Sequence, residues 1–319
     1  MDVLTTKESR MRAIVTSPGS DPRFTVTACP IPVPAPNQAL IRVIAFSLNQ
    51  GEVRTAMTAT TQYIPGWDFA GIIIKAASNG HSPKEGTRVF GFVPQGAWAE
   101  YIVAAGAQMA TIPDDVSDAQ AASLPVASGT AVTCIETVGS LLNRHVLITG
   151  AAGGVGRILS QLTAMAGAKV FAVSRRPNLK QQMENDGVIP QAVFTTIEDA
   201  KAAGKYDVVF DSIGGHVLAV ALSMLTTNGT CVNFGNSSRQ PTTFNVRSAE
   251  WPFHRKQLIF LGPEVPADCT AVFTHIAELV KQKRLHTPID KELPWTSIAE
   301  AAELLVQQQV NGKIVLKVV

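Results

Sequence analysis

One stretch, residues 146–176, constrains the fold of this chain more than any other. An apolar run at 146–148 leads into a glycine cluster at 150–156. Apolar residues three or four apart then follow along 155–166, which predicts a helix with one apolar face. Gly167 is placed to end that helix, and a second apolar run follows it. Strand, glycine turn, helix and strand form a βαβ unit of the kind that binds a dinucleotide.

The glycine turn suits a pyrophosphate group. Backbone N–H groups at a helix N-terminus are unpaired, and the helix dipole favours negative charge there. Gly153 and Gly156 would keep side chains away from the phosphate, although Ala151 replaces the first glycine of the G-x-G-x-x-G pattern. A structural glycine turn in any parallel α/β domain is the alternative. The predicted cofactor contacts of the turn are Ala152, Gly153, Gly154, Val155 and Gly156.

The end of the second strand predicts which nicotinamide cofactor is bound. Sites specific for NAD usually place an acid here, about 20 residues past the turn, to bind the ribose 2′-hydroxyl. This chain has Ser174, Arg175 and Arg176 instead, and no acid before Glu184. A hydroxyl and two guanidinium groups suit a 2′-phosphate, so we predict NADPH over NADH. The alternative is that both arginines are only solvated.

The composition excludes several classes of function. Of the 319 residues, 46% are hydrophobic and 16% are charged, and the net charge is +2. This balance gives no reason to propose nucleic acid or an anionic membrane as a partner. No apolar run approaches about 18 residues and the N-terminal stretch lacks a signal-peptide core, so we expect a cytoplasmic protein. A lightly charged surface leaves room for apolar subunit contacts, and we predict a homodimer.

The sequence pattern differs between the first part of the chain and the part from Arg144 onward. Residues 11–115 hold short strand-like runs broken by Gly and Pro, which predicts a small β-barrel. From Arg144 onward, apolar runs alternate with helix-length segments, which predicts a doubly wound parallel sheet. The expected strands of that sheet are 146–149, 169–173, 193–195, 208–211, 231–234 and 258–261. A last strand at 314–319 is expected to return to the barrel.

Short motifs along the whole chain carry a family resemblance. They are GWDFAG (66–71), GTRVFGF (86–92), GAWAEYIV (96–103), AASLPVASGTA (121–131), AAGGVG (151–156), YDVVFDSIGG (206–215), NGTCVNFGNSS (228–238) and NGKIVLKV (311–318). Together they resemble the medium-chain dehydrogenase/reductase superfamily, in its zinc-free quinone oxidoreductase (zeta-crystallin-like) branch. In that branch an alanine at the position of Ala151 is expected.

The resemblance implies an α/β fold with two domains. One is a GroES-like β-barrel catalytic domain, and the other is a Rossmann cofactor domain with a doubly wound parallel sheet. We place the first part of the catalytic domain at 1–123, the NADP-binding domain at 124–265, and the return to the catalytic domain at 266–319. Hydride transfer is expected in the cleft between the domains.

A departure from the zinc-dependent relatives argues against a metal. Those relatives use a Cys or Asp, a His and a second Cys as catalytic ligands. Asn49 occupies the place of the first ligand here, Trp67 occupies that of the His, and the loop 124–131 offers no Cys. The chain's four cysteines also lack C-x-x-C spacing. A catalytic Zn²⁺ needs about three protein ligands, so we predict that none is bound.

Without a metal, the expected substrate is one whose acceptor is already activated. Quinones and α,β-unsaturated carbonyls accept hydride at carbon and delocalise the charge onto oxygen. The protein then positions NADPH and supplies a hydrogen-bond donor to that oxygen. We therefore predict an NADPH-dependent quinone or enone reductase. Two alternatives remain: an enoyl-thioester reductase that acts in trans in a biosynthetic pathway, and a non-catalytic NADPH-binding protein.

The resemblance also implies roles for single residues. Tyr63 matches a tyrosine near the substrate pocket and is the expected donor to the substrate oxygen, with a packed loop tyrosine as the alternative. Asn49 resembles an asparagine near the nicotinamide ribose, and a turn-forming asparagine is its alternative. Glu52 and Arg54 are interpreted as structural, with an ion pair between them as one option. Further expected cofactor contacts are Thr130, Phe234, Gly235, Asn311 and Lys313.

Overall fold

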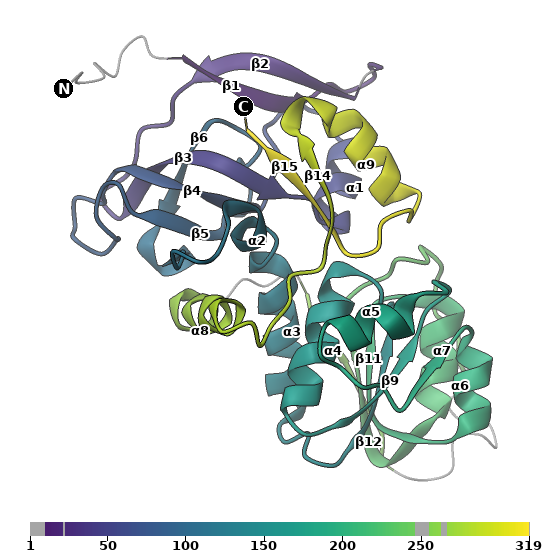
Figure 1. The fold of residues 1–319 in the computed structure, drawn as a ribbon. Helices are drawn as coiled ribbons and strands as arrows, with labels where there is room; N and C mark the ends of the chain where they lie inside the picture. The colour runs from purple at the N-terminus through teal and green to yellow at the C-terminus, as the bar shows by residue number, and fades with distance from the viewer. Residues whose placement is uncertain (1–9, 22, 246–254, 263–266, 319) are drawn as a thin grey trace. The chain divides into compact units, whose positions relative to one another are not determined.

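The structure is a computed structural model, and it describes residues 10–21, 23–245, 255–262 and 267–318. The chain divides into two compact units, Met1–Gly129 with Val265–Val319 and Thr130–Glu264 (Figure 1). The first boundary between these units lies after Gly129, inside a helix, and the expected domain bounds 1–123, 124–265 and 266–319 stay a prediction.

A seven-stranded sheet forms the centre of the first unit. Its strands are β3 (Gln38–Ser47), β4 (Asp68–Lys75), β5 (Arg88–Phe92), β6 (Tyr101–Ala105), β7 (Met109–Thr111), β14 (Ile289–Pro294) and β15 (Lys313–Lys317). Their order is β14-β15-β3-β4-β5-β7, and β6 pairs with β3. The last strand, β15, pairs antiparallel with β3, so the C-terminal tail returns to the first unit as the sequence pattern indicated.

Shorter elements complete the first unit around a large aromatic core. β1 (Arg10–Thr16) and β2 (Phe24–Pro30) form a separate antiparallel pair. The helical elements are α1 (Gln50–Met57), η1 (Gly106–Gln108), α2 (Asp118–Ala122), α8 (Thr270–Lys281), η2 (Trp295–Ser297) and α9 (Ile298–Val306). Trp98 is fully buried between Phe24 and Phe46, at centroid distances of 5.6 and 6.0 Å. Such aromatic packing ties the small strand pair to the larger sheet.

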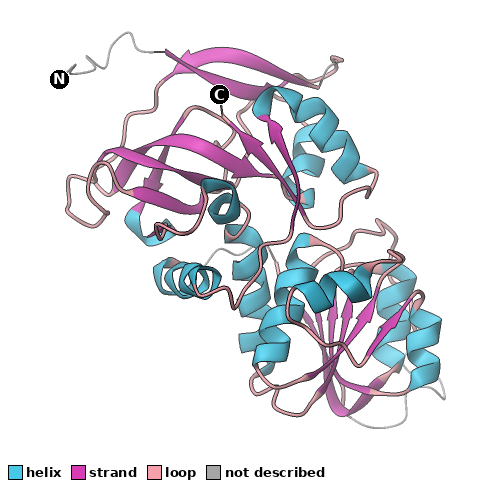
Figure 2. Cartoon of the chain, in the orientation of Figure 1, coloured by secondary structure: helices cyan, strands magenta, loops and turns pink. Residues whose placement is uncertain are grey.

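The second unit is a doubly wound parallel sheet, as predicted. Its strands are β8 (His145–Thr149), β9 (Lys169–Val173), β10 (Ala192–Phe194), β11 (Tyr206–Asp211), β12 (Leu225–Asn233) and β13 (Gln257–Phe260). The helices are α3 (Pro125–Val138), which crosses the boundary between the units, α4 (Gly154–Met165), α5 (Leu179–Asn185), α6 (Ile197–Ala203) and α7 (Gly215–Ser223). Helices cover both faces of the sheet, with α4 and α5 on one face and α6 and α7 on the other (Figures 1 and 2).

The strand order locates the functional edge of this sheet. The order is β10-β9-β8-β11-β12-β13, so the chain first winds outward from β8 and then returns to wind outward from β11. In such sheets ligands bind outside the carboxyl ends of the strands where the order reverses. The reversal point here is the boundary between β8 and β11.

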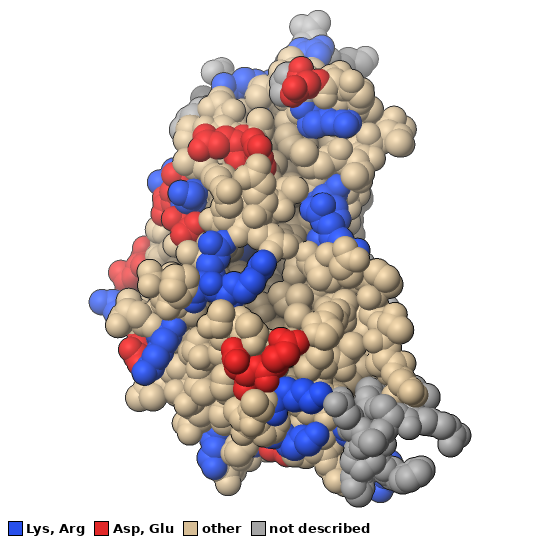
Figure 3. All heavy atoms as spheres, turned by 90° about the vertical axis from the view of Figure 1, so that its right-hand side faces the viewer, with Lys and Arg blue, Asp and Glu red and all other residues tan. Residues whose placement is uncertain are grey.

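The composition predicts a lightly charged surface. Figure 3 shows one face on which basic and acidic side chains lie among broad areas of other residues. Within the described part of the chain, no helix is long and apolar enough to cross a membrane.

Candidate functional site

The glycine turn has the geometry of a phosphate cradle. It joins β8 to α4, and the N-cap of α4 is Gly153, which no described side chain caps. The main-chain N–H groups at the start of α4 are therefore available to an anion. A Cβ at position 156 would collide with the carbonyl oxygen of Gly150, so only glycine allows this close turn. These features fit a dinucleotide, whose pyrophosphate would lie against the turn.

Asp211 organises the loops at the reversal point. This carboxylate is fully buried at the end of β11 and accepts a 2.6 Å hydrogen bond from Thr149 Oγ1 at the end of β8. It also accepts from the main-chain N of Gly214 at 2.9 Å and from Asn233 Nδ2 at 2.7 Å. The sequence analysis assigned Asp211 no role, although an acid that ends an apolar strand was a usable signal.

Asn233 continues this network to two predicted cofactor contacts. Its Nδ2 donates to the carbonyl oxygen of Gly235 at 2.8 Å, and the main-chain N of Phe234 donates to the carbonyl oxygen of Asp211 at 2.9 Å. Phe234 and Gly235 are thus held at the carboxyl end of β12, beside the reversal point. Their contact with a cofactor stays a prediction.

The residues expected to select NADPH form a turn after β9. The main-chain N of Ser174 donates to the carbonyl oxygen of Phe194 at 2.9 Å. Ser174 Oγ accepts from the main-chain N of Arg176 at 3.0 Å and still has its own proton to donate. Arg175 is exposed and Arg176 is half-buried. The turn therefore brings one serine and two arginines together at the end of one strand.

A buried polar cluster joins the two predicted site residues of the first unit, Asn49 and Lys313. Lys313 Nζ donates to Asn49 Oδ1 at 2.6 Å, to Asp68 Oδ2 at 3.0 Å and to the carbonyl oxygen of Leu48 at 3.1 Å. The side chains of Lys313 and Asp68 are only 4% and 0% exposed. All three protons of the ammonium group are therefore used inside the protein, and a role of Lys313 in cofactor binding would act through Asn49.

Asp68 holds several elements together. Its Oδ2 also accepts from Ser47 Oγ at 2.6 Å and from Asn49 Nδ2 at 2.8 Å. Its Oδ1 accepts from the main-chain N of Val126, in the first turn of α3, at 2.9 Å. One carboxylate thus links β3, β4 and α3 to the cluster. No role for Asp68 was predicted from the sequence, because nothing local shows how many donors converge on it.

The cluster fixes the orientation of the Asn49 amide. Nδ2 donates to Glu52 Oε1 at 3.1 Å as well as to Asp68, and Oδ1 accepts from Lys313. The second lone pair of Asn49 Oδ1 can still accept a hydrogen bond from a ligand. Glu52 points into this network, and no ion pair joins it to Arg54 among the described residues.

Tyr63 lies in the loop between α1 and β4, half-buried against the core of the first unit. No described residue forms a hydrogen bond with its hydroxyl group. Burial raises the pKa of this phenol, and the nearby Glu52 carboxyl raises it further. The hydroxyl is therefore protonated at neutral pH and is available as a donor.

Trp67 follows in the same loop and packs against α1. A Cβ at position 51 would come within 2.8 Å of its indole ring, so Gly51 is needed for this contact. Its ring centroid lies 6.2 Å from that of Phe92.

The other two predicted contacts lie in different units. Thr130, on α3, is half-buried and begins the second unit. Asn311 precedes β15 in the first unit, and its Oδ1 atom is buried without a hydrogen-bond partner among the described residues. An unpaired buried acceptor of this kind is costly unless a ligand or water supplies a donor. Both contacts stay predictions.

The donor set does not fit a catalytic zinc. The place of the first ligand is held by Asn49, whose oxygen already accepts from the Lys313 ammonium group, and Trp67 has no ligating atom. Among the described residues no group of three or more His, Cys, Asp or Glu side chains could hold a metal ion. Metal independence nevertheless remains a prediction that direct metal analysis must test.

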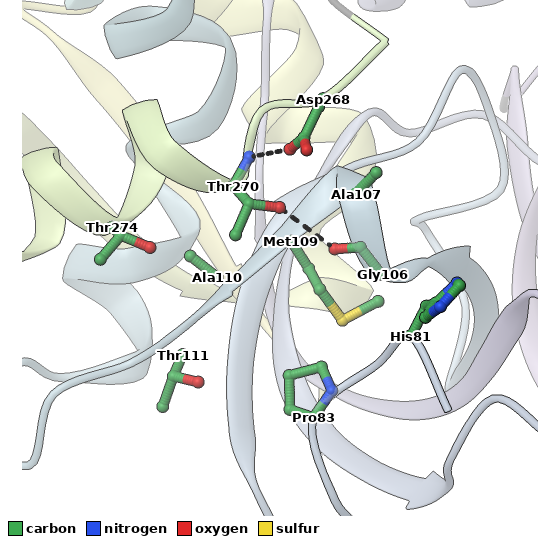
Figure 4. A pocket seen from close by; sticks show the side chains of 10 residues that line it. All are labelled: His81, Pro83, Gly106, Ala107, Met109, Ala110, Thr111, Asp268, Thr270 and Thr274. Carbon is green, nitrogen blue, oxygen red and sulfur yellow. Dashed lines mark hydrogen bonds between the residues drawn. The ribbon is translucent and has the colours of Figure 1, made fainter. Parts of the chain in front are cut away.

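A separate pocket of the first unit lies where η1 and β7 meet the start of α8 (Figure 4). His81, Met109 and Asp268 are among the residues that line it, and no predicted site residue does. Asp268 Oδ1 accepts from the main-chain N of Thr270 at 2.8 Å, so this carboxylate caps the helix. The pocket is not part of the predicted site.

Comparison with known proteins adds family information. A family model described as "Alcohol dehydrogenase GroES-like domain" matches residues 35–114, and one described as "Zinc-binding dehydrogenase" matches residues 184–316. A quinone-oxidoreductase homolog of Spinacia oleracea, described as chloroplastic, is 29% identical over 311 residues, which cover 90% of this chain and 92% of that protein.

Two further similarities extend over nearly the whole chain. A mycocerosic acid synthase-like polyketide synthase of Mycobacterium tuberculosis is 25% identical over 330 aligned positions, which cover 98% of this chain but only 16% of that protein. The structure of a quinone oxidoreductase from Coxiella burnetii superimposes with a TM-score of 0.86 at 24% identity, covering 98% of this chain and 100% of that one. The last comparison shows that the two chains share a fold.

Proposed function

Because the chain belongs to the medium-chain dehydrogenase/reductase superfamily of oxidoreductases, in its quinone-oxidoreductase-like branch, we propose that it reduces a quinone or an α,β-unsaturated carbonyl with NADPH and without a metal. The observation that carries the proposal is the set of hydrogen bonds from Lys313 to Asn49 and Asp68. The positive charge of the bound ammonium group at these oxygens disfavours a second cation that would polarise a simple carbonyl. A conjugated acceptor needs no such cation.

The cofactor would be held by the second unit. Its pyrophosphate suits the uncapped start of α4 and the cradle kept open by Gly156, and its 2′-phosphate suits the turn of Ser174, Arg175 and Arg176. Bound NADPH supplies the hydride. The protein's remaining task is to orient the acceptor and to stabilise the charge that develops on its oxygen.

Tyr63 is the residue proposed for that second task. Its hydroxyl is protonated, because burial raises its pKa, and no described residue forms a hydrogen bond with it. A donor aimed at the developing oxyanion stabilises the transition state more than the ground state. Asn49, held rigidly by its neighbours, would present one oxygen lone pair to the nicotinamide ribose.

A second function of the same chemistry has its own support. The polyketide synthase relative aligns with 98% of this chain, although the chain covers only 16% of that protein. Reduction of an enoyl thioester in trans is therefore the alternative substrate class. Tight NADPH binding without turnover would instead indicate a non-catalytic binding protein.

The test is NADPH oxidation with a panel of quinones, small enones and enoyl thioesters. Turnover with quinones or enones supports the proposal, turnover with thioesters alone supports the alternative, and no turnover refutes both. Tyr63→Phe should lower kcat roughly 10²-fold with little change in NADPH affinity. Tyr101→Phe, in β6, is the matched control and should leave kcat unchanged.

We also propose a cytoplasmic homodimer with no nucleic-acid or membrane partner. The net charge of +2 and the lightly charged surface support this assignment. Sedimentation velocity over a range of concentrations would test the dimer, and a single monomeric species at micromolar concentration would refute it.

A further inference from the structure

Glu52 is a buried acid whose two oxygens have different surroundings. It lies in the first turn of α1 and is 2% exposed. Its Oε1 atom accepts from the main-chain N of Asn49 at 2.7 Å and from Asn49 Nδ2 at 3.1 Å. Its Oε2 atom is buried and has no hydrogen-bond partner among the described residues. The carboxyl group is therefore bonded on one side only.

Lys313 only partly compensates a negative charge on Glu52, and no described residue forms a hydrogen bond with Oε2. The ammonium of Lys313 is the nearest candidate, but its three protons go to Leu48, Asn49 and Asp68. Asp68, on the neighbouring strand β4, carries a like charge and shares the Asn49 amide with Glu52. An ionised Glu52 would therefore face repulsion in addition to the cost of leaving water.

In the part of the chain that the structure describes, two other elements near Glu52 carry a phenol and exposed acids. Tyr63, in the following loop, is neutral at physiological pH and can offer only a hydroxyl. Helix α9 packs against α1, and its acids Glu300 and Glu303 are exposed to solvent. Desolvation by burial is the largest cause that raises the pKa of Glu52, and the Asp68 charge is the next. Lys313 and the hydrogen bonds from Asn49 lower this pKa, and the net result is a rise from 4.5 to about 8.

We propose that Glu52 is a positioning residue that works as a neutral acid: Oε1 fixes the orientation of the Asn49 amide, and Oε2 carries the proton. A neutral carboxyl group accepts at its carbonyl oxygen, here Oε1. At Oε2, which has no described partner, an unpaired hydroxyl costs less than an unpaired charge. The proton leaves Lys313 and Asp68 as a balanced pair of opposite charges. Asn49 is then held from three sides, by Glu52, Asp68 and Lys313.

As a consequence, activity should fall at basic pH. When Glu52 loses its proton, a second negative charge appears close to that of Asp68. The single nitrogen Nδ2 of Asn49 then donates to two carboxylate anions. The effect on turnover rests on the function proposed above, whereas the proton on Oε2 does not. For one ionisation, kcat should fall about tenfold per pH unit above the pKa of Glu52.

The variant that isolates the proton is Glu52→Gln. A glutamine amide keeps an acceptor at one end and a donor at the other, and it cannot ionise. The basic limb of the kcat profile near pH 8 should disappear in this variant. Glu300→Gln, an exposed substitution on α9, is the matched control and should keep the wild-type limb. A limb that persists in Glu52→Gln overturns the proposal.

A spectroscopic measurement separates this inference from the question of turnover. Infrared difference spectra of the wild type across neutral to alkaline pH should show the carbonyl band of a protonated carboxyl group, lost as the pH rises, and Glu52→Gln should lack it. This measurement needs neither substrate nor cofactor. An ionised Glu52 at neutral pH would overturn the inference even in an active enzyme, and a protonated Glu52 in an inactive protein would refute only the proposed function.

Discussion

Lys313 Nζ donates a 2.6 Å hydrogen bond to Asn49 Oδ1, across 264 positions of the sequence. The two residues meet because β15, at the end of the chain, pairs with β3, which ends at Ser47 shortly before Asn49. The same ammonium group forms a buried ion pair with Asp68, so the C-terminal strand supplies the positive charge that this carboxylate needs. The predicted site of the first unit therefore forms only when the whole chain has folded.

The first prediction concerns this pair. Lys313→Met would leave the Asp68 carboxylate buried at 0% exposure without its counter-charge. Removing one partner of a buried ion pair costs about 3–5 kcal/mol, and urea denaturation should show a loss of that size. Lys317→Met is the control, because Lys317 and its partner Glu292 are 53% and 40% exposed, and it should cost under about 1 kcal/mol. Similar losses in both variants would contradict the prediction.

The second prediction concerns the glycine turn. Gly156→Ala would place a methyl group against the Gly150 carbonyl and force the turn open. NADPH affinity, measured by fluorescence titration, should fall at least tenfold, or about 1.4 kcal/mol. Gly262→Ala should leave affinity unchanged, because no described residue beyond its chain neighbours lies within 4 Å of its Cβ position. Unchanged binding in Gly156→Ala would mean that the cofactor does not use this turn.

The third prediction separates the two cofactors. Arg175→Ala should weaken NADPH binding by about 1.5–3 kcal/mol, the range for a charge-assisted hydrogen bond, and leave NADH binding nearly unchanged. The control Lys180→Ala removes a lysine that is 69% exposed on the neighbouring helix α5, and it should affect neither cofactor. Calorimetric titration with each cofactor gives both values. Equal losses for NADPH and NADH would assign the arginine to the fold alone.

The fourth prediction concerns stability and pH. The pKa of Glu52 is about 8 in the folded chain and near 4.5 when the side chain is exposed, so the folded state retains a proton that the unfolded state releases. This contribution to stability is full below pH 4.5, falls as the pH rises, and is lost above about pH 8. The wild type should therefore lose stability across this window relative to Glu52→Gln.

Thermal unfolding of both proteins at several pH values checks this prediction. The difference in Tm between wild type and Glu52→Gln should change steadily from acidic to mildly basic pH and then level off. Glu300→Gln should show no such trend relative to the wild type, since that side chain is exposed. A constant difference between wild type and Glu52→Gln would show that Glu52 titrates alike in the folded and unfolded chains.

Local pattern was enough to predict most elements of the second unit. All six strands of its sheet overlap the expected runs, although β12 (Leu225–Asn233) begins well before the expected run 231–234. Buried parallel strands are short apolar runs, and the glycine turn marks where helix α4 starts. In the first unit, α1 and α9 were not predicted. The sequence NQGEVR at the start of α1 shows little apolar periodicity, and its capping by Asn49 and Glu52 is visible only in the structure.

The sequence alone was therefore enough to predict the family, the two kinds of domain and the glycine turn, because short motifs and local apolar patterns indicate them. Only the tertiary structure decided how Asn49, Glu52, Asp68 and Lys313 share their protons. Those side chains come from α1, its N-cap, β4 and β15. The pairing of these donors and acceptors depends on how distant elements pack together, which a local sequence pattern does not predict.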